Sequence, residues 1–192
     1  MCARRRSAPS AWTRPWSNTG NWRMLYTIST IGFAGKTAEE FFRLLSAASV
    51  KKLIDVRENR VGQLSGFAKY PDLPFFLEKL GPIEYAYEPL LAPSPPIRKA
   101  YRQSRDWAAY EESFLQLMKE RGIPENLDTT RFEGNVALLC SEPGPEQCHR
   151  RLVAELLARH WQALGHTVSI LHLVSDGLAS TSKVKNRRRK ND

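Results

Sequence analysis

The stretch from Val136 to Arg151 constrains the fold most, because it reads as a strand, a tight loop and the start of a helix. Val136–Cys140 is a short apolar run of the kind that forms a buried strand. The loop after it contains two prolines and a glycine at positions 143–145, which end regular structure. An amphipathic helix is predicted from about Cys148 to Leu164. This order of elements predicts one unit of an α/β sheet.

The start of this predicted helix carries an unusual set of side chains. A thiol, an imidazole and a guanidinium follow one another at Cys148, His149 and Arg150, and the carboxylate of Glu142 precedes them in the loop. The free N–H groups and the dipole of a helix N-terminus favour anions, and they lower the pKa of a thiol placed there. The stretch therefore predicts an anion site beside a reactive thiol at Cys148, although it does not name a reaction.

The remaining chain repeats the alternation of strands and helices. Four further strands are predicted over Leu25–Ile31, Lys52–Val56, Ile83–Tyr87 and Thr167–Leu173. Helices are predicted over Thr37–Ala48, where Thr37 and Glu40 form a capping box, over Asp72–Leu80, and over Arg98–Arg121 in one or two pieces. The Pro89–Pro96 segment is predicted to contain neither helix nor strand. We expect a single α/β domain over residues 24–174, with a mostly parallel sheet of about five strands and helices on both faces.

The positive charge of the chain belongs to its two ends. The formal net charge is +9, yet residues 24–174 hold 18 basic and 18 acidic residues. We therefore expect residues 1–23 and 175–192 to be disordered basic extensions that bear most of any nucleic-acid binding. Met24, the first residue of ordered character, is a candidate for the true start of translation. A transit peptide or a binding arm is the alternative interpretation of residues 1–23.

Composition and motifs exclude several classes of protein. A hydrophobic content of 42% supports a packed core, and the absence of any run of 18 apolar residues predicts no membrane span. Three cysteines cannot form a disulfide framework, and residues 1–23 lack the apolar segment of a secretion signal, so we expect a cytoplasmic location. Neither a Walker A nor a Gly-x-Gly-x-x-Gly pattern occurs, and we expect no cofactor.

Polar residues end the predicted strands at the edge where parallel strands place their carboxyl ends. In strand order these are Gly32, then Asp55 and Arg57, then Tyr87 and Glu88, then Cys140 and Glu142. Ligands of open α/β sheets bind outside this edge, so the convergence predicts a site.

Each of these residues also has a plainer interpretation. Asp55 and Arg57 could pair with each other, and Glu142 could be a solvated acid in its loop. Cys140 and Cys148 could be buried packing residues, since free cysteine behaves as a small hydrophobe.

Several motifs resemble those of the DUF488 family, a set of prokaryotic proteins of unknown function. The matching pieces are Thr30-Ile31-Gly32-Phe33, Asp55-Val56-Arg57, Gly66-Phe67-x-Lys69, Tyr85, Leu138-Leu139-Cys140-Ser141-Glu142 and Cys148-His149-Arg150. The resemblance covers residues 24–173 and implies the α/β fold. It also implies that Gly32 and Tyr85 belong to a shared polar cluster, and it implies no established reaction.

Together these residue types predict a small enzyme that acts on a phosphate-bearing or otherwise anionic substrate, such as a nucleotide or a nucleic acid. Cys148 is the candidate nucleophile or redox thiol, and Glu142 or Asp55 is the candidate acid or base. The candidate substrate-binding residues are Arg57, His149, Arg150, Gly32 and Tyr85.

Two other classes of function remain open from the sequence. The same cluster could hold an anionic ligand without catalysis. It could also bind a metal ion through Cys140, Cys148 and His149, although their spacing is not a standard zinc pattern and a fourth ligand is not obvious. We therefore assign no metal ligands from the sequence.

Overall fold

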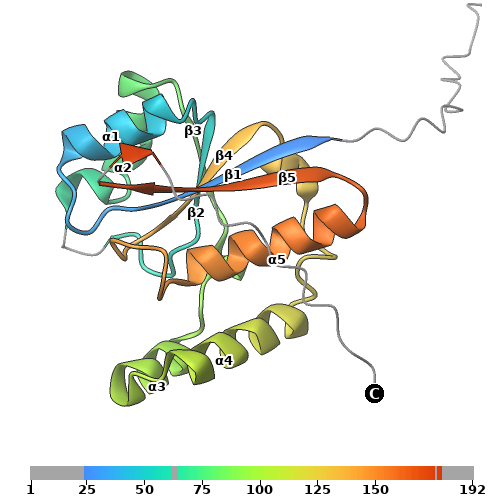
Figure 1. The fold of residues 1–192 in the computed structure, drawn as a ribbon. Coiled ribbons are helices and arrows are strands. Elements are labelled where there is room, and N and C mark those ends of the chain that lie inside the picture. Colours follow the sequence, from blue (N-terminus) through green and yellow to red (C-terminus); the bar gives the residue numbers. More distant parts are fainter. Residues whose placement is uncertain (1–23, 62–64, 176, 179–192) are drawn as a thin grey trace, which may run out of the picture.

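The computed structural model describes residues 24–61, 65–175 and 177–178, and Figure 1 shows its fold. Residues 1–23 and 179–192 lie outside the described residues, as do the expectations made for them.

In the described part of the chain, a mixed sheet of six strands forms the centre of the domain, in the order β3-β2-β4-β1-β5-β6. The strands are β1 (Leu25–Gly32), β2 (Lys52–Asp55), β3 (Glu84–Tyr87), β4 (Asn135–Cys140), β5 (Thr167–Val174) and β6 (Gly177–Leu178). The first five are parallel, and β6 pairs antiparallel with β5. The predicted α/β class with a five-stranded parallel sheet is confirmed, and β6 continues the sheet past the predicted domain boundary at residue 174.

Helices cover both faces of this sheet (Figure 1). The bounds are α1 (Ala38–Ala47), α2 (Asp72–Leu80), α3 (Pro95–Ser104), α4 (Trp107–Glu120) and α5 (His149–Ala163). One apolar core lies between the sheet and α1 with α2, and a second core lies between the sheet and α4 with α5. Strand β4 supplies both cores, since Val136 and Leu138 face one and Ala137 and Leu139 face the other. This is the alternation that a strand buried on both faces requires. Among the described residues, no helix combines the length and apolar character needed to cross a membrane.

The prolines between β3 and α4 do not prevent helix formation, and the prediction for Pro89–Pro96 is wrong. A short 3₁₀ helix occupies Pro89–Leu91, and α3 begins at Pro95. Proline is tolerated in the first helical turn because the N–H that it lacks has no partner there. The break that divides the predicted Arg98–Arg121 helix falls at Arg105, whose φ of 56° lies in the left-handed region. The predicted cap at Thr37 is present, with the Glu40 N–H donating to its hydroxyl.

The strand order places a topological switch point between β1 and β4. From β1 the chain crosses to β2 through α1, whereas from β4 it crosses to β5 on the other side through α5. The connections that leave the carboxyl ends of β1 and β4 therefore diverge. Such a divergence is where open α/β sheets form their ligand crevice.

Candidate functional site

Two cysteine thiols meet at this switch point. The Sγ atoms of Cys140, the last residue of β4, and Cys148, the cap of α5, lie 2.6 Å apart. Both cysteines are free, and their exposed fractions are 0% and 1%. The loop between them therefore folds back so that its two ends form one buried dithiol.

The guanidinium of Arg150 lies directly against this dithiol. Its Nη1 is 2.9 Å from Cys140 Sγ and 3.2 Å from Cys148 Sγ, and it donates to the carbonyl oxygen of Glu142 at 2.7 Å. Arg150 is completely buried. A buried guanidinium is stable only beside hydrogen-bond acceptors or negative charge, and here two sulfurs and a carbonyl oxygen supply the acceptors.

Gly32 makes the close packing around Arg150 possible. A Cβ atom at this position would lie 1.7 Å from the Glu142 carbonyl oxygen and 2.8 Å from Arg150 Nη1. The backbone N–H of Ala34 also donates to the Ser141 carbonyl at 3.0 Å. The predicted site residue Gly32 thus contributes by letting the loop after β4 approach the end of β1.

Glu142 and His149 complete the buried cluster. Although Glu142 is exposed as a residue, its Oε2 accepts from Cys140 Sγ at 2.5 Å and from Cys148 Sγ at 3.1 Å. Burial alone would raise the pKa of this carboxyl, but the His149 charge and the two thiol hydrogen bonds outweigh burial and lower it. Burial lowers the pKa of His149, whose Nε2 lies 3.0 Å from the Val56 carbonyl oxygen. The cluster therefore places a carboxyl group of lowered pKa beside an imidazole of lowered pKa.

The expected lowering of the Cys148 pKa is wrong for this arrangement. Burial raises the pKa of the Cys148 thiol well above its ordinary value, and the neighbouring Cys140 and Glu142 add to the rise, against the opposing charge of Arg150. As the cap of α5, Cys148 makes no side-chain hydrogen bond to the helix N–H groups. The thiol turns toward Cys140 instead, so the helix terminus does not stabilise a thiolate.

Asp55, Arg57 and Tyr85 form a second polar group beside the dithiol. The fully buried Asp55 carboxylate accepts from Arg57 Nε at 2.8 Å, from Arg57 Nη2 at 2.7 Å and from the Tyr85 hydroxyl at 2.8 Å. Burial also raises the pKa of Tyr85, which keeps its hydroxyl proton for this bond. The plainer interpretation, in which Asp55 and Arg57 pair with each other, describes this geometry.

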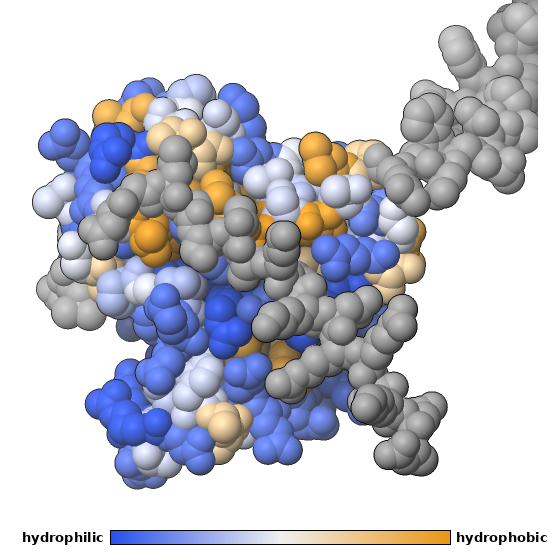
Figure 2. Space-filling model, viewed as in Figure 1, coloured by the Kyte–Doolittle hydropathy of each residue, from blue (hydrophilic) through white to orange (hydrophobic). Residues whose placement is uncertain are grey.

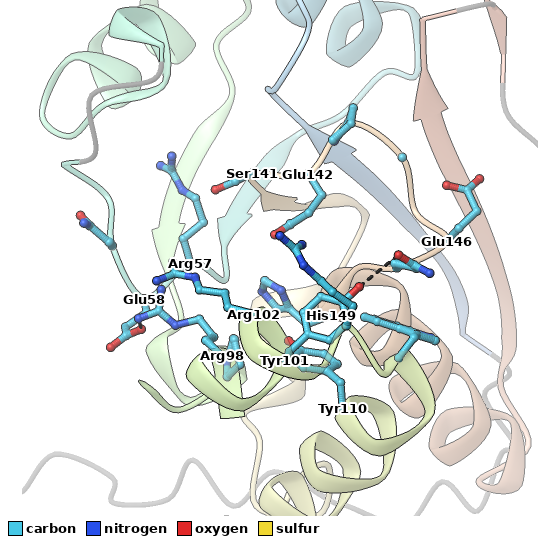
Figure 3. A pocket seen from close by; sticks show the side chains of 17 residues that line it. Arg57, Glu58, Arg98, Tyr101, Arg102, Tyr110, Ser141, Glu142, Glu146 and His149 are labelled. Atoms are coloured by element: carbon cyan, nitrogen blue, oxygen red, sulfur yellow. Dashed lines mark hydrogen bonds and ion pairs between the residues drawn. The ribbon is translucent and has the colours of Figure 1, made fainter. Parts of the chain in front are cut away.

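A cleft of about 700 Å³ opens over these groups, between the carboxyl edge of the sheet and the α3–α4 pair (Figure 3). Of the predicted site residues, Arg57, Glu142 and His149 line it, whereas Cys148, Arg150, Gly32, Asp55 and Tyr85 do not. The site residues thus divide into three that reach the cleft and five that support it from below.

The part of the sequence that forms most of this site matches a known family profile. The profile of DUF488, described as a domain of unknown function, matches residues 37–157. The chain belongs to the DUF488 family. The match spans more than half of the 192 residues and includes the dithiol, Arg150 and every residue that lines the cleft. No curated protein and no solved structure matched the chain.

The wall of the cleft that α3 and α4 provide was not predicted from the sequence. Arg98, Arg102 and Arg105 enter the cleft from α3 and its cap, and three aromatic rings lie among them. These rings are Tyr101, Trp107 and Tyr110. The Trp107 and Tyr110 rings stack with centroids 4.9 Å apart, and the Tyr101 hydroxyl donates across the cleft to Gln147 Oε1 at 3.0 Å.

A signal for this wall is present in the sequence. Residues 95–105 contain four basic residues and no acid, but a charge count over the whole of residues 24–174 conceals that local excess. The lower part of the face shown in Figure 2, where Figure 1 places α3 and α4, is mostly hydrophilic. The arrangement can hold an anion between α3 and the sheet edge while presenting an aromatic surface beside it.

Proposed function

We propose that the cleft binds a phosphate-bearing ligand with a flat aromatic ring, of the nucleotide class. The observation that carries the proposal is the joint presence of arginines from two directions and of stacked rings on one wall. Guanidinium groups bind phosphate oxygens in pairs, and aromatic side chains accept a base on their faces. A volume of about 700 Å³ lies within the range of small-molecule sites.

The arginines of the cleft differ in their availability. Arg57 is held by Asp55, and Arg98 forms an ion pair with Glu58. Arg102 and Arg105 form no ion pair with another described residue. They are therefore the positions at which a ligand phosphate meets the least competition.

Binding has more support than nucleophilic catalysis by Cys148. This thiol lies beneath the cleft, does not line it, and has a raised pKa, so it is neither placed nor charged for attack on a ligand in the cleft. Glu142 does line the cleft, and its lowered pKa leaves it ionised. It is the acid–base candidate if the ligand is also a substrate.

Isothermal titration of the full chain with ATP, adenosine and inorganic phosphate tests the proposal. We expect ATP to bind more tightly than adenosine or inorganic phosphate alone, because ATP engages the arginines and the aromatic rings together. Arg102→Gln should weaken ATP binding roughly tenfold, the effect of losing one charge-assisted hydrogen bond. Lys99→Gln is the matched control, since Lys99 lies exposed on α3 outside the cleft. Equal effects of the two substitutions, or no ATP binding, would refute the proposal.

A further inference from the structure

We propose that Cys140, Cys148, His149 and Glu142 form a binding site for a divalent transition-metal ion of the zinc class. Each residue offers one ligand atom, and the four atoms all lie within 4.8 Å of one another. Glu142 is the fourth ligand that the sequence alone does not indicate. Two sulfurs, one nitrogen and one carboxylate oxygen are all donors that Zn²⁺ accepts.

The hydrogen bond of the His149 ring is compatible with a role as a metal ligand. Its Nε2 lies 3.0 Å from the Val56 carbonyl oxygen, an acceptor, so Nε2 carries the proton. The lone pair of the neutral ring is then on Nδ1. Histidines that bind metals use one ring nitrogen and donate the other N–H to a carbonyl or carboxylate in this way, which fixes the tautomer and the ring orientation.

Metal binding leaves the charge of the buried cluster unchanged. Two thiol protons leave to solvent as one M²⁺ ion enters, and two M–S bonds replace two S–H bonds. The guanidinium of Arg150 faces both sulfurs and donates to the backbone carbonyl oxygen of Glu142, and neither contact requires a change in its charge during the exchange. No oxidant or reductant takes part, because Zn²⁺ has no redox chemistry.

The dithiol must open slightly to hold the ion. Two sulfurs about 2.3 Å from a tetrahedral zinc ion lie roughly 3.8 Å apart. The Sγ atoms are 2.6 Å apart here, so they must separate by about 1 Å. Cys148 is a helix cap at the end of a loop and not an interior helical residue, which allows this adjustment. Glu142 and His149 also line the cleft, so a bound ion would lie at its floor.

The test uses the reduced full-length chain, metal alone and no nucleotide, so its result is independent of the proposed ligand. We expect Zn²⁺ to bind with a stoichiometry of one and to release two protons in weak buffer. Co²⁺ should bind in its place and give the intense sulfur-to-cobalt charge-transfer absorption of thiolate ligation. Cys148→Ser should remove most of that absorption and weaken Zn²⁺ binding by more than about tenfold, whereas Cys2→Ser should change neither.

Because Cys148→Ser could unfold this buried cluster, Glu142→Gln provides a second variant. It keeps the size of the side chain, and it should weaken Zn²⁺ binding while the chain retains its far-UV circular dichroism. Zinc bound equally well by Cys148→Ser and by the natural chain would overturn the proposal, as would a Co²⁺ complex without charge-transfer absorption. Quantitative formation of a Cys140–Cys148 disulfide with air as oxidant while Zn²⁺ is present would also overturn it, because thiolates bound to zinc are protected from oxidation.

Discussion

The Asp55–Arg57 pair offers the sharpest test of how the site is supported. The Asp55 carboxylate accepts four hydrogen bonds, three from Arg57 and one from Tyr85. Exposed fractions of 0% for Asp55 and 6% for Arg57 mean that water cannot replace a lost partner. Asp55→Asn removes the charge and leaves the guanidinium buried without a counter-ion, which costs about 3–5 kcal/mol of the free energy of unfolding.

Urea denaturation of single and double variants measures this cost. Arg57→Gln should destabilise by a similar amount, because it leaves a buried carboxylate. The double variant, with two neutral side chains, should cost less than the sum of the single effects by roughly 2–3 kcal/mol. Glu84→Gln is the matched control, since the Lys52–Glu84 pair joins β2 to β3 with a largely exposed carboxylate and should contribute under about 1 kcal/mol.

Two results would refute the reasoning. Additive single effects would show that the two charges do not stabilise each other. A cost for Asp55→Asn as small as that for Glu84→Gln would show that the carboxylate is hydrated. If Asp55 acts only by holding Arg57, then Asp55→Asn and Arg57→Gln should also weaken ATP binding equally, with no further loss in the double variant.

Three further predictions concern the cluster itself. Gly32→Ala should destabilise the fold by roughly 1–3 kcal/mol or more, because its Cβ would overlap the Glu142 loop, whereas Gly66→Ala, with no atom within 4 Å of the new Cβ, should change the melting temperature little. Because burial lowers the pKa of His149, the unfolded chain takes up a proton first as the pH falls through about 6.5, so the free energy of unfolding should decrease from pH 7.5 to 5. Urea titrations should show a flatter pH dependence for His149→Gln, and an unchanged slope would refute this origin. In native metal-free protein, Cys148 should react with a thiol reagent far more slowly than in urea, and rapid labelling at pH 6 would contradict its raised pKa.

Elements whose signals are local could be predicted from the sequence. The apolar run of β4 and the periodic face of α5 each lie within one short window, and the structure places both within a residue or two of the prediction. The gathering of Gly32, Asp55 and Cys140 at one edge also follows from parallel strands, since β1, β2 and β4 share a register there. The position of these site residues could therefore be predicted from the expected parallel topology.

Properties that depend on contacts across the fold could not be predicted this way. The raised pKa of Cys148 follows from burial and from a second thiol 2.6 Å away, neither of which a helix-start pattern contains. The wall formed by α3 was missed for a different reason. Prolines at 93, 95 and 96 were interpreted as breakers, although Pro95 and Pro96 begin the helix that carries Arg98 and Arg102.

The cleft arginines also differ in the free energy needed to separate each one from its present carboxylate partner. Arg57 shares a buried carboxylate, and separating that pair would leave two desolvated charges, so it can offer a ligand only the donors that Asp55 leaves. Arg98 pairs with Glu58 where both side chains are about one-third exposed, and such a pair is worth about 1 kcal/mol or less. A phosphate can therefore displace Glu58 from Arg98 at small cost, and Arg102 needs no displacement. Under the proposed function, we therefore expect an anion to bind from the α3 side, while Arg57 stays paired with Asp55.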